Sequence, residues 1–205
     1  MHLFYPILDL ATLSRLHLDS FQSAAELLEE GAKILQFRHK GHFSRDIFRQ
    51  AQEIAGLCRQ AGATFVINDR ADIARLLGSA LHLGQDDLSP TAARLVTGPE
   101  TLIGFSTHNE SQLRATASEP ADYLALGPIF GTSSKENPDP PVGLAELKRL
   151  RPMTNRPLVA IGGITRANAQ SVIEAGADSV AVIGDLFGEG NLKARAKEWK
   201  QVLIA

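Results

Sequence analysis

Several polar side chains of this sequence follow short apolar runs and are of the types that bind phosphates and divalent metals. Gln36, Arg38 and Lys40 come after one such run, and alternate residues of an extended chain point to the same side. An amide, a guanidinium and an ammonium that converge in this way can bind a phosphate, the guanidinium through two parallel hydrogen bonds. A solvated basic loop is the alternative, but Gln36 beside buried residues would then be costly to orient.

Two carboxylates follow the next two apolar runs. Asp69 closes the segment Ile67-Asn68-Asp69-Arg70, and Asp87 lies beyond the run that contains Leu81. On neighbouring strand ends, the two would form a site for Mg²⁺, which binds few protein oxygens and completes its octahedron with water and phosphate. Asp69 could equally be the N-cap of a following helix. His82 is interpreted as a packed or supporting histidine rather than a catalyst.

Ser106 and Lys135 are two further candidate ligands for an anion. Ser106 follows the fifth run and can donate a hydrogen bond, while no acid or nucleophile-elbow pattern that would indicate a hydrolytic triad surrounds it. Lys135 lies in the polar, proline-rich segment 131–142. Irregular segments of this length are usually functional, so Lys135 is either an exposed loop residue or a group that reaches the substrate when the loop closes.

Glycine-containing turns follow the last two apolar runs, as Gly162-Gly163 and as Ile183-Gly184. Glycine lets backbone amides approach an anion closely, and the helix that follows adds the positive end of its dipole. Paired loops of this kind after strands 7 and 8 form the usual phosphate site of (β/α)8 barrels. The two turns therefore predict binding of a phosphate monoester.

The elements that must position these residues alternate between strand-like and helix-like segments. Apolar runs without polar alternation are typical of strands buried on both faces. Eight such segments occur, at residues 3–8, 34–35, 65–67, 80–81, 102–103, 123–126, 158–161 and 179–182. The amphipathic stretches between them predict helices over 24–31, 45–62, 71–78, 109–118, 144–150, 167–176 and 192–203. This repeat predicts one domain, residues 1–205, folded as a single (β/α)8 TIM barrel of the α/β class. An open doubly wound sheet is the alternative, although no glycine fingerprint follows the first strand.

Composition excludes several classes of partner. The 205 residues are 44% hydrophobic and 21% charged, with a formal net charge of −2. This charge argues against nucleic acid or an anionic membrane as a partner. We find neither a basic leader followed by an apolar stretch nor an apolar run of membrane-spanning length, which predicts a cytoplasmic location. The oligomeric state stays open, with a homo-oligomer as one option.

Six ordered motifs across nearly the whole chain resemble the family of thiamine phosphate synthases and thiazole tautomerases. They are Gln-x-Arg-x-Lys at 36–40, Ile-Asn-Asp-Arg at 67–70, His-Leu-Gly-Gln-x-Asp at 82–87, Gly-x-Ser-x-His at 104–108, Gly-Pro-Ile-Phe-x-Thr-x-Ser-Lys at 127–135 and Ala-Ile-Gly-Gly-Ile at 160–164. The resemblance implies an Mg²⁺-dependent transferase that joins an aminopyrimidine pyrophosphate to a thiazole phosphate and releases pyrophosphate by a dissociative substitution.

The resemblance also implies a role for each matching residue. The pyrimidine pyrophosphate would be held by Gln36, Arg38, Lys40, Asn68, Ser106 and Lys135, of which Arg38, Lys40, Ser106 and Lys135 would be catalytic. The Mg²⁺ would be held by Asp69 and Asp87. The thiazole phosphate would contact Thr132, Ser134, Gly163 and the amides of Ile183 and Gly184. Gly184 replaces a serine that is common in the family, so one hydroxyl contact to the phosphate is lost.

Three other functions are compatible with such a barrel. A thiazole tautomerase characteristically has a histidine near the position of Pro128, and proline cannot act as a base. A Schiff-base aldolase would use Lys40 or Lys135, but neither lies in an apolar strand that would lower its pKa. A non-catalytic barrel that binds thiamine phosphate would be expected to lose charged site residues, and we find all of them retained.

Overall fold

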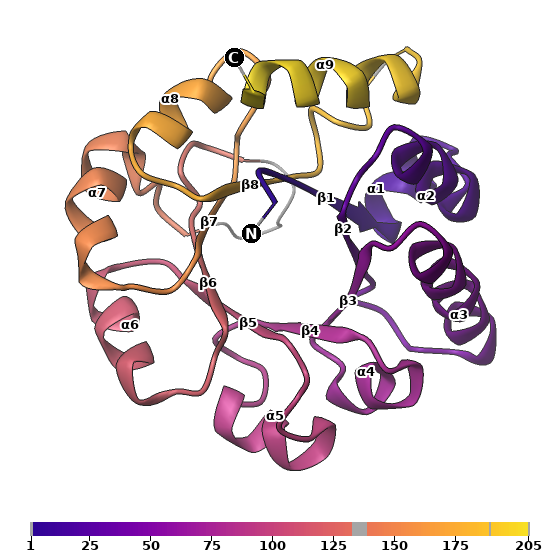
Figure 1. The fold of residues 1–205 in the computed structure, drawn as a ribbon, viewed down its shortest axis with the longest axis horizontal. Helices are drawn as coiled ribbons and strands as arrows, with labels where there is room; N and C mark the ends of the chain where they lie inside the picture. The colour runs from indigo at the N-terminus through magenta and orange to yellow at the C-terminus, as the bar shows by residue number, and fades with distance from the viewer. Residues whose placement is uncertain (1, 133–138, 189, 205) are drawn as a thin grey trace.

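The computed structural model describes residues 2–132, 139–188 and 190–204. In these residues eight parallel strands form a closed barrel in sequence order, with the helices around its outside (Figure 1). Strand β8 (Ser179–Val182) pairs with strand β1 (Phe4–Asp9), with Pro6 opposite Val182, and so closes the ring. The predicted (β/α)8 TIM barrel is confirmed, and the open doubly wound sheet is wrong.

The remaining strands are β2 (Ile34–Arg38), β3 (Thr64–Asn68), β4 (Ala80–Leu83), β5 (Ile103–Thr107), β6 (Tyr123–Leu126) and β7 (Leu158–Ile161). The helices are α1 (Leu10–Arg15), α2 (Ser20–Glu29), α3 (Arg45–Gln60), α4 (Ala71–Leu77), α5 (Pro90–Thr97), α6 (Glu110–Ala115), α7 (Gly143–Leu150), α8 (Ala169–Glu174) and α9 (Leu192–Ile204). Two short 3₁₀ turns, Thr116–Ser118 and Arg151–Met153, follow α6 and α7.

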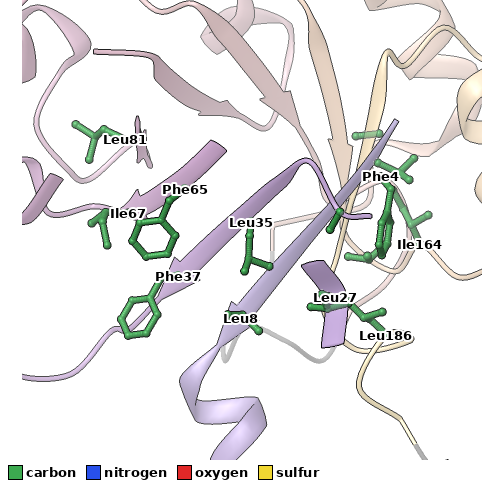
Figure 2. Close-up of a cluster of buried hydrophobic side chains, with 14 of the residues drawn as sticks. Phe4, Leu8, Leu27, Leu35, Phe37, Phe65, Ile67, Leu81, Ile164 and Leu186 are labelled. Atoms are coloured by element: carbon green, nitrogen blue, oxygen red, sulfur yellow. The ribbon is translucent and has the colours of Figure 1, made fainter. Parts of the chain in front are cut away.

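Alternation along each strand divides the hydrophobic side chains between two layers. On β1, Tyr5 and Ile7 point into the barrel, where they pack with residues such as Val66 and Val159. The alternate residues Phe4 and Leu8 belong to the larger layer between the barrel and the helices. Figure 2 shows Leu8 of β1, Leu35 of β2 and Leu27 of α2 in that outer layer. The strands are thus buried on both faces, as the continuous apolar runs predicted.

Local signals set the helix boundaries. The side chain of Ser44 accepts a hydrogen bond from the Ile47 amide and so begins α3, as expected of an N-cap serine. Gly62 follows α3 in a left-handed conformation, with φ 61°, which ends the helix near the predicted position. Helices α1 and α5 have no counterpart among the predicted helices. Helix α1 begins directly after β1 ends at Asp9, so no turn signal separates the two elements. Helix α5 has the exposed apolar residues Leu95 and Val96, which weaken the contrast between its two faces.

Candidate functional site

A cavity of about 340 Å³ opens at the carboxyl ends of the strands, and most of the predicted site residues line it. Those that do are Gln36, Arg38, Lys40, Asn68, Asp69, Ser106, Thr132, Gly163, Ile183 and Gly184. Asp87 is not among the lining residues but contacts Asp69. Ser134 and Lys135 lie outside the described residues. The volume is within the usual range for a small-molecule site.

Strand β2 supplies the cationic side of the cavity. Gln36 is buried, Arg38 is partly buried, and Lys40 lies beyond the strand with a largely exposed side chain. All three line the cavity, as the alternation along an extended chain predicted. Arg38 forms an ion pair with the buried carboxylate of Asp9 at the end of β1. Asp9 also accepts hydrogen bonds from the Thr12 amide and hydroxyl. These bonds fix the Asp9 carboxylate, which in turn fixes the Arg38 guanidinium.

Asp69 and Asp87 form a carboxylate pair on neighbouring strand ends. Burial is the main cause that raises the pKa of Asp69 from 3.8 to about 6, and its contact with Asp87 raises it further, while Lys40 acts in the opposite direction. The Lys40 Nζ atom lies 2.5 Å from Asp69 Oδ2. Asp87 accepts a hydrogen bond from the Gly84 amide at 2.7 Å. The second carboxylate is thereby fixed next to the first.

The alternative role of Asp69 as a helix N-cap is wrong. The N-cap of α4 is Arg70, and no side chain caps that helix. Asp69 instead has a left-handed backbone, with φ 66°, and its amide donates to the His82 carbonyl at 2.8 Å. Aspartate tolerates this conformation better than most residues. The turn directs the carboxylate into the cavity instead of along the helix.

The carboxylate pair fits Mg²⁺ better than a metal that needs several protein ligands. Within the described ranges, no group of three or more His, Cys, Asp or Glu side chains could hold a metal ion. Mg²⁺ commonly takes one or two carboxylates and fills its octahedron with water and substrate phosphates. Hard carboxylate oxygens on Asp69 and Asp87 match that donor set.

Replacing Asp69 with asparagine is expected to stabilise the metal-free protein above pH 6. Because the fold raises the pKa of this carboxyl to about 6, the folded state retains a proton that the unfolded state loses near pH 4. The unfolding free energy of the wild type therefore falls as the pH rises through this interval. Thermal unfolding in EDTA should show a higher midpoint for Asp69→Asn at pH 7.5, and a smaller difference at pH 4.5.

Asp72→Asn provides a control of opposite sign, because the hydrogen bond from Arg70 lowers the pKa of Asp72. Its stabilising contribution is present at neutral pH and lost on acidification. A difference between Asp69→Asn and wild type that did not change with pH would contradict the assigned cause.

Asn68 presents a buried donor without a protein partner in the described part of the chain. The residue is 7% exposed, its Nδ2 atom makes no hydrogen bond there, and it lines the cavity. A buried unsatisfied donor costs about 1–3 kcal/mol. The cost is understandable if a bound ligand accepts from this amide.

Glycines after β7 bring the loops of two strands into contact. Gly162 and Gly163 have φ values of 95° and 63°, and a Cβ atom on Gly162 would lie 2.4 Å from Pro128 Cβ. The Ile129 amide donates to the Ile161 carbonyl at 2.8 Å, and the Phe130 amide donates to Gly162 at 3.0 Å. Only glycine allows this close approach.

The chain that leaves β6 is also fixed where it returns. The Val142 amide donates to the Pro128 carbonyl at 2.7 Å, and the Gly143 amide donates to Ile129 at 2.9 Å. Segment 128–130 is therefore held both by the turn after β7 and by the start of α7.

Backbone amides on this side of the cavity remain available to an anion. No hydrogen bond within the described residues uses the N–H of Gly163 or Gly184, and both residues line the cavity. The Asn168 side chain holds the turn by accepting from the Thr165 amide and donating to the Gly163 carbonyl. The predicted phosphate loops after β7 and β8 thus lie together at one wall.

Sequence reasoning missed three buried polar residues that support the site: Asp9, Tyr5 and Tyr123. Asp9 pairs with Arg38, while the two tyrosine hydroxyls lie inside the barrel at 2.9 Å from each other. The available signal was a polar group within or at the end of a strand predicted to be fully buried, where it must find a partner. His108, which has no role among the sequence-based predictions, lines the cavity and contacts the Gly127 carbonyl through Nδ1 at 2.5 Å.

With the barrel and cavity established, comparison with known proteins assigns the chain to a family. The family model described as thiamine monophosphate synthase matches residues 4–186. This chain therefore belongs to the thiamine monophosphate synthase family, as the motif resemblance indicated.

Individual relatives agree with this assignment. A protein named thiamine-phosphate synthase from Koribacter versatilis (strain Ellin345) is 49% identical, over 98% of this chain and 90% of that protein. One with the same name from Methanoculleus marisnigri is 43% identical, over 93% of this chain and 90% of that protein. The structure of a thiamine phosphate pyrophosphorylase from Pyrococcus furiosus matches with a TM-score of 0.87 and 28% identity, covering 98% of this chain and 95% of that one.

No described helix combines the length and the hydrophobicity needed to cross a membrane.

Proposed function

We propose that this chain is a thiamine-phosphate synthase, which joins an aminopyrimidine pyrophosphate to a thiazole phosphate and releases pyrophosphate. One observation carries the proposal beyond family membership. The cations and carboxylates on β2 and β3 line the same cavity as the phosphate loops after β7 and β8. Strands β3 and β7 lie across the barrel from each other. One cavity thus offers separate sites for two anionic substrates.

The reaction breaks the bond between the pyrimidine methylene carbon and the pyrophosphate oxygen, which leaves with the electron pair. The thiazole nitrogen then donates its pair to that carbon. Because the electron-rich pyrimidine ring supports positive charge on the carbon, no protein nucleophile is needed. The protein has to stabilise charge on the leaving oxygens and to hold the thiazole nitrogen in line.

The cationic side of the cavity, at β2 and β3, would stabilise charge on the leaving oxygens. Arg38 is held by Asp9 in a fixed position, from which its guanidinium can bind two oxygens of one phosphate. Lys40 adds a positive charge beside Asp69, and Asn68 and Ser106 add neutral donors. When bound at Asp69 and Asp87, Mg²⁺ would neutralise charge on the leaving pyrophosphate. Lys135 is proposed as a further cation.

The phosphate loops after β7 and β8 would hold the thiazole nitrogen in line. Gly163 and the amides of Ile183 and Gly184 would bind the thiazole phosphate, and Thr132 and Ser134 would contact the same substrate. Pro128 lines the cavity next to Gly162 and offers no group that could transfer a proton. This supports the synthase over a thiazole tautomerase.

A two-substrate assay tests the proposal. Product is expected only when the aminopyrimidine pyrophosphate, the thiazole phosphate and Mg²⁺ are all present, because charge on the leaving group must be neutralised before the bond breaks. Thiamine phosphate is measured as fluorescent thiochrome after oxidation, and omission of each component in turn is the control. Absence of product from protein shown to be folded by circular dichroism would reject the function.

A further inference from the structure

Five polar side chains form one continuous hydrogen-bond chain across the interior of the barrel. Gln36 Nε2 lies 2.9 Å from the Tyr5 hydroxyl, which lies 2.9 Å from the Tyr123 hydroxyl. His82 Nδ1 lies 3.0 Å from that hydroxyl, and His82 Nε2 lies 2.9 Å from Ser106 Oγ. This hydrogen-bond chain joins five strands, and both of its end residues, Gln36 and Ser106, line the cavity.

With His82 neutral and each tyrosine proton bonded to a neighbour in this hydrogen-bond chain, two arrangements of protons are possible, because each tyrosine hydroxyl has one proton. Gln36 donates to Tyr5 through Nε2, so the Tyr5 proton must go to Tyr123, and the Tyr123 proton must go to His82 Nδ1. A histidine that accepts at Nδ1 is neutral and carries its proton on Nε2. That proton goes to Ser106 Oγ, so the Ser106 proton is left for an acceptor in the cavity.

The opposite arrangement reverses every donor. Tyr5 would then donate to Gln36 Oε1, His82 would carry its proton on Nδ1, and Ser106 would donate to His82. In that state Ser106 has no proton for a ligand and Gln36 presents its NH₂ group to the cavity. The two arrangements thus give the cavity opposite hydrogen-bonding properties at both ends of the chain.

We propose that Tyr5, Tyr123 and His82 are positioning residues that hold the chain in the first arrangement, so that Ser106 is a dedicated donor and Gln36 Oε1 a dedicated acceptor for the substrate. The proposal rests on the proposed function, because the pyrophosphate supplies acceptors for Ser106 and the amino group of the pyrimidine supplies a donor for Gln36. No hydrogen bond within the described residues reaches Gln36 Oε1, although Gln36 is only 2% exposed.

The surrounding residues keep the hydrogen-bond chain intact. Burial raises the pKa of Tyr5 to about 12 and that of Tyr123 well above 10, so both hydroxyls keep their protons. The His82 ring stacks on the Tyr123 ring, with centroids 5.5 Å apart. Gly104 provides the space for that tyrosine, because a Cβ atom there would lie 2.0 Å from Tyr123 Cζ.

The first test reads the proton positions in the ligand-free wild type. Long-range ¹H–¹⁵N correlation spectra of protein labelled with ¹⁵N-histidine distinguish a protonated from an unprotonated ring nitrogen, and the spectrum of His82→Asn identifies the His82 signals. We expect His82 to carry its proton on Nε2 with Nδ1 unprotonated. A proton on Nδ1, whether in the other tautomer or in an imidazolium, would overturn the proposal.

The second test removes one hydroxyl from the middle of the chain. In Tyr123→Phe, His82 Nδ1 loses its donor, so we expect a mixture of tautomers in the same spectra and a roughly tenfold higher KM for the pyrimidine pyrophosphate. The KM for the thiazole phosphate should stay within about twofold, because its site lies at the other wall. Tyr5→Phe provides the same test at the next position if Tyr123→Phe does not fold.

Thr97→Val is the matched control, since it also removes one buried hydroxyl, bonded to the Ala93 carbonyl in α5 away from the cavity. It should leave both KM values unchanged. Equal changes in both KM values for Tyr123→Phe, or no change in either, would contradict a positioning role. An inactive wild type with His82 protonated on Nε2 would reject the proposed function alone, whereas an active wild type with the proton on Nδ1 would reject this inference alone.

Discussion

We expect Asp87→Asn to keep its fold and to lose about 1000-fold in kcat/KM, which corresponds to about 4 kcal/mol of transition-state stabilisation. Asparagine retains an oxygen that can accept from the Gly84 amide, so the loop geometry should survive. What is lost is the charge that would hold Mg²⁺ next to Asp69. Asp69→Asn should have a similar effect. Steady-state kinetics over a range of Mg²⁺ concentrations would show a lower kcat/KM that added metal restores only in part.

Asp86→Asn is the matched control, because it makes the same chemical change one residue away at an exposed position. Its kinetics should equal those of the wild type. Wild-type kinetics for Asp87→Asn at limiting Mg²⁺ would remove this residue from the metal site.

The second large effect is expected from Gly104→Ala. The added Cβ atom would lie 2.0 Å from Cζ of the buried Tyr123 ring and 2.4 Å from its hydroxyl oxygen. Because that ring is held by hydrogen bonds to Tyr5 and His82, it has little freedom to move away. We expect the unfolding free energy to fall by about 3 kcal/mol, and the thermal midpoint to fall by about 10 °C for a domain of this size.

Gly56→Ala is the control for Gly104→Ala. Gly56 lies within α3, and a Cβ atom there would have no heavy atom within 4 Å, so alanine should stabilise the helix by about 0.5–1 kcal/mol. A thermal midpoint of Gly104→Ala within about 2 °C of the wild type would show that the barrel interior can rearrange around Tyr123.

The fold was predictable because its signals are local. Continuous apolar runs identified the strands, and Tyr123–Leu126, Leu158–Ile161 and Ser179–Val182 have the predicted boundaries. Glycines after helices marked their ends. The strand at Ile103–Thr107 extends beyond its predicted apolar part because Ser106 and Thr107 still pair with β6. Pairing of polar residues depends on the neighbouring strand, which a single segment does not reveal.

The lining of the site was also predictable, because it depends on one rule. Side chains at the carboxyl ends of parallel strands converge on one face of a barrel, so the strand-end positions of Gln36, Asn68 and Ser106 in the sequence predict that they lie together. Their binding roles stay predictions, as does the metal site at Asp69 and Asp87.

The supporting contacts were not predictable, because they depend on register across the barrel. Tyr5 and Tyr123 are 118 residues apart in sequence, and nothing in either segment indicates that their hydroxyls meet. The pairing of Asp9 with Arg38 likewise requires the register of β1 against β2, and a one-residue shift would turn either side chain to the opposite face.

Pro128, Ile129 and Phe130 are held on one side by the turn after β7 and on the other by Val142 and Gly143. Both flanks of the connection between β6 and α7 are therefore held at one place in the barrel, and residues inserted or deleted between Phe130 and Val142 need not shift the strands. Evolution can therefore vary the length and composition of this connection while the turn after β7 stays in place.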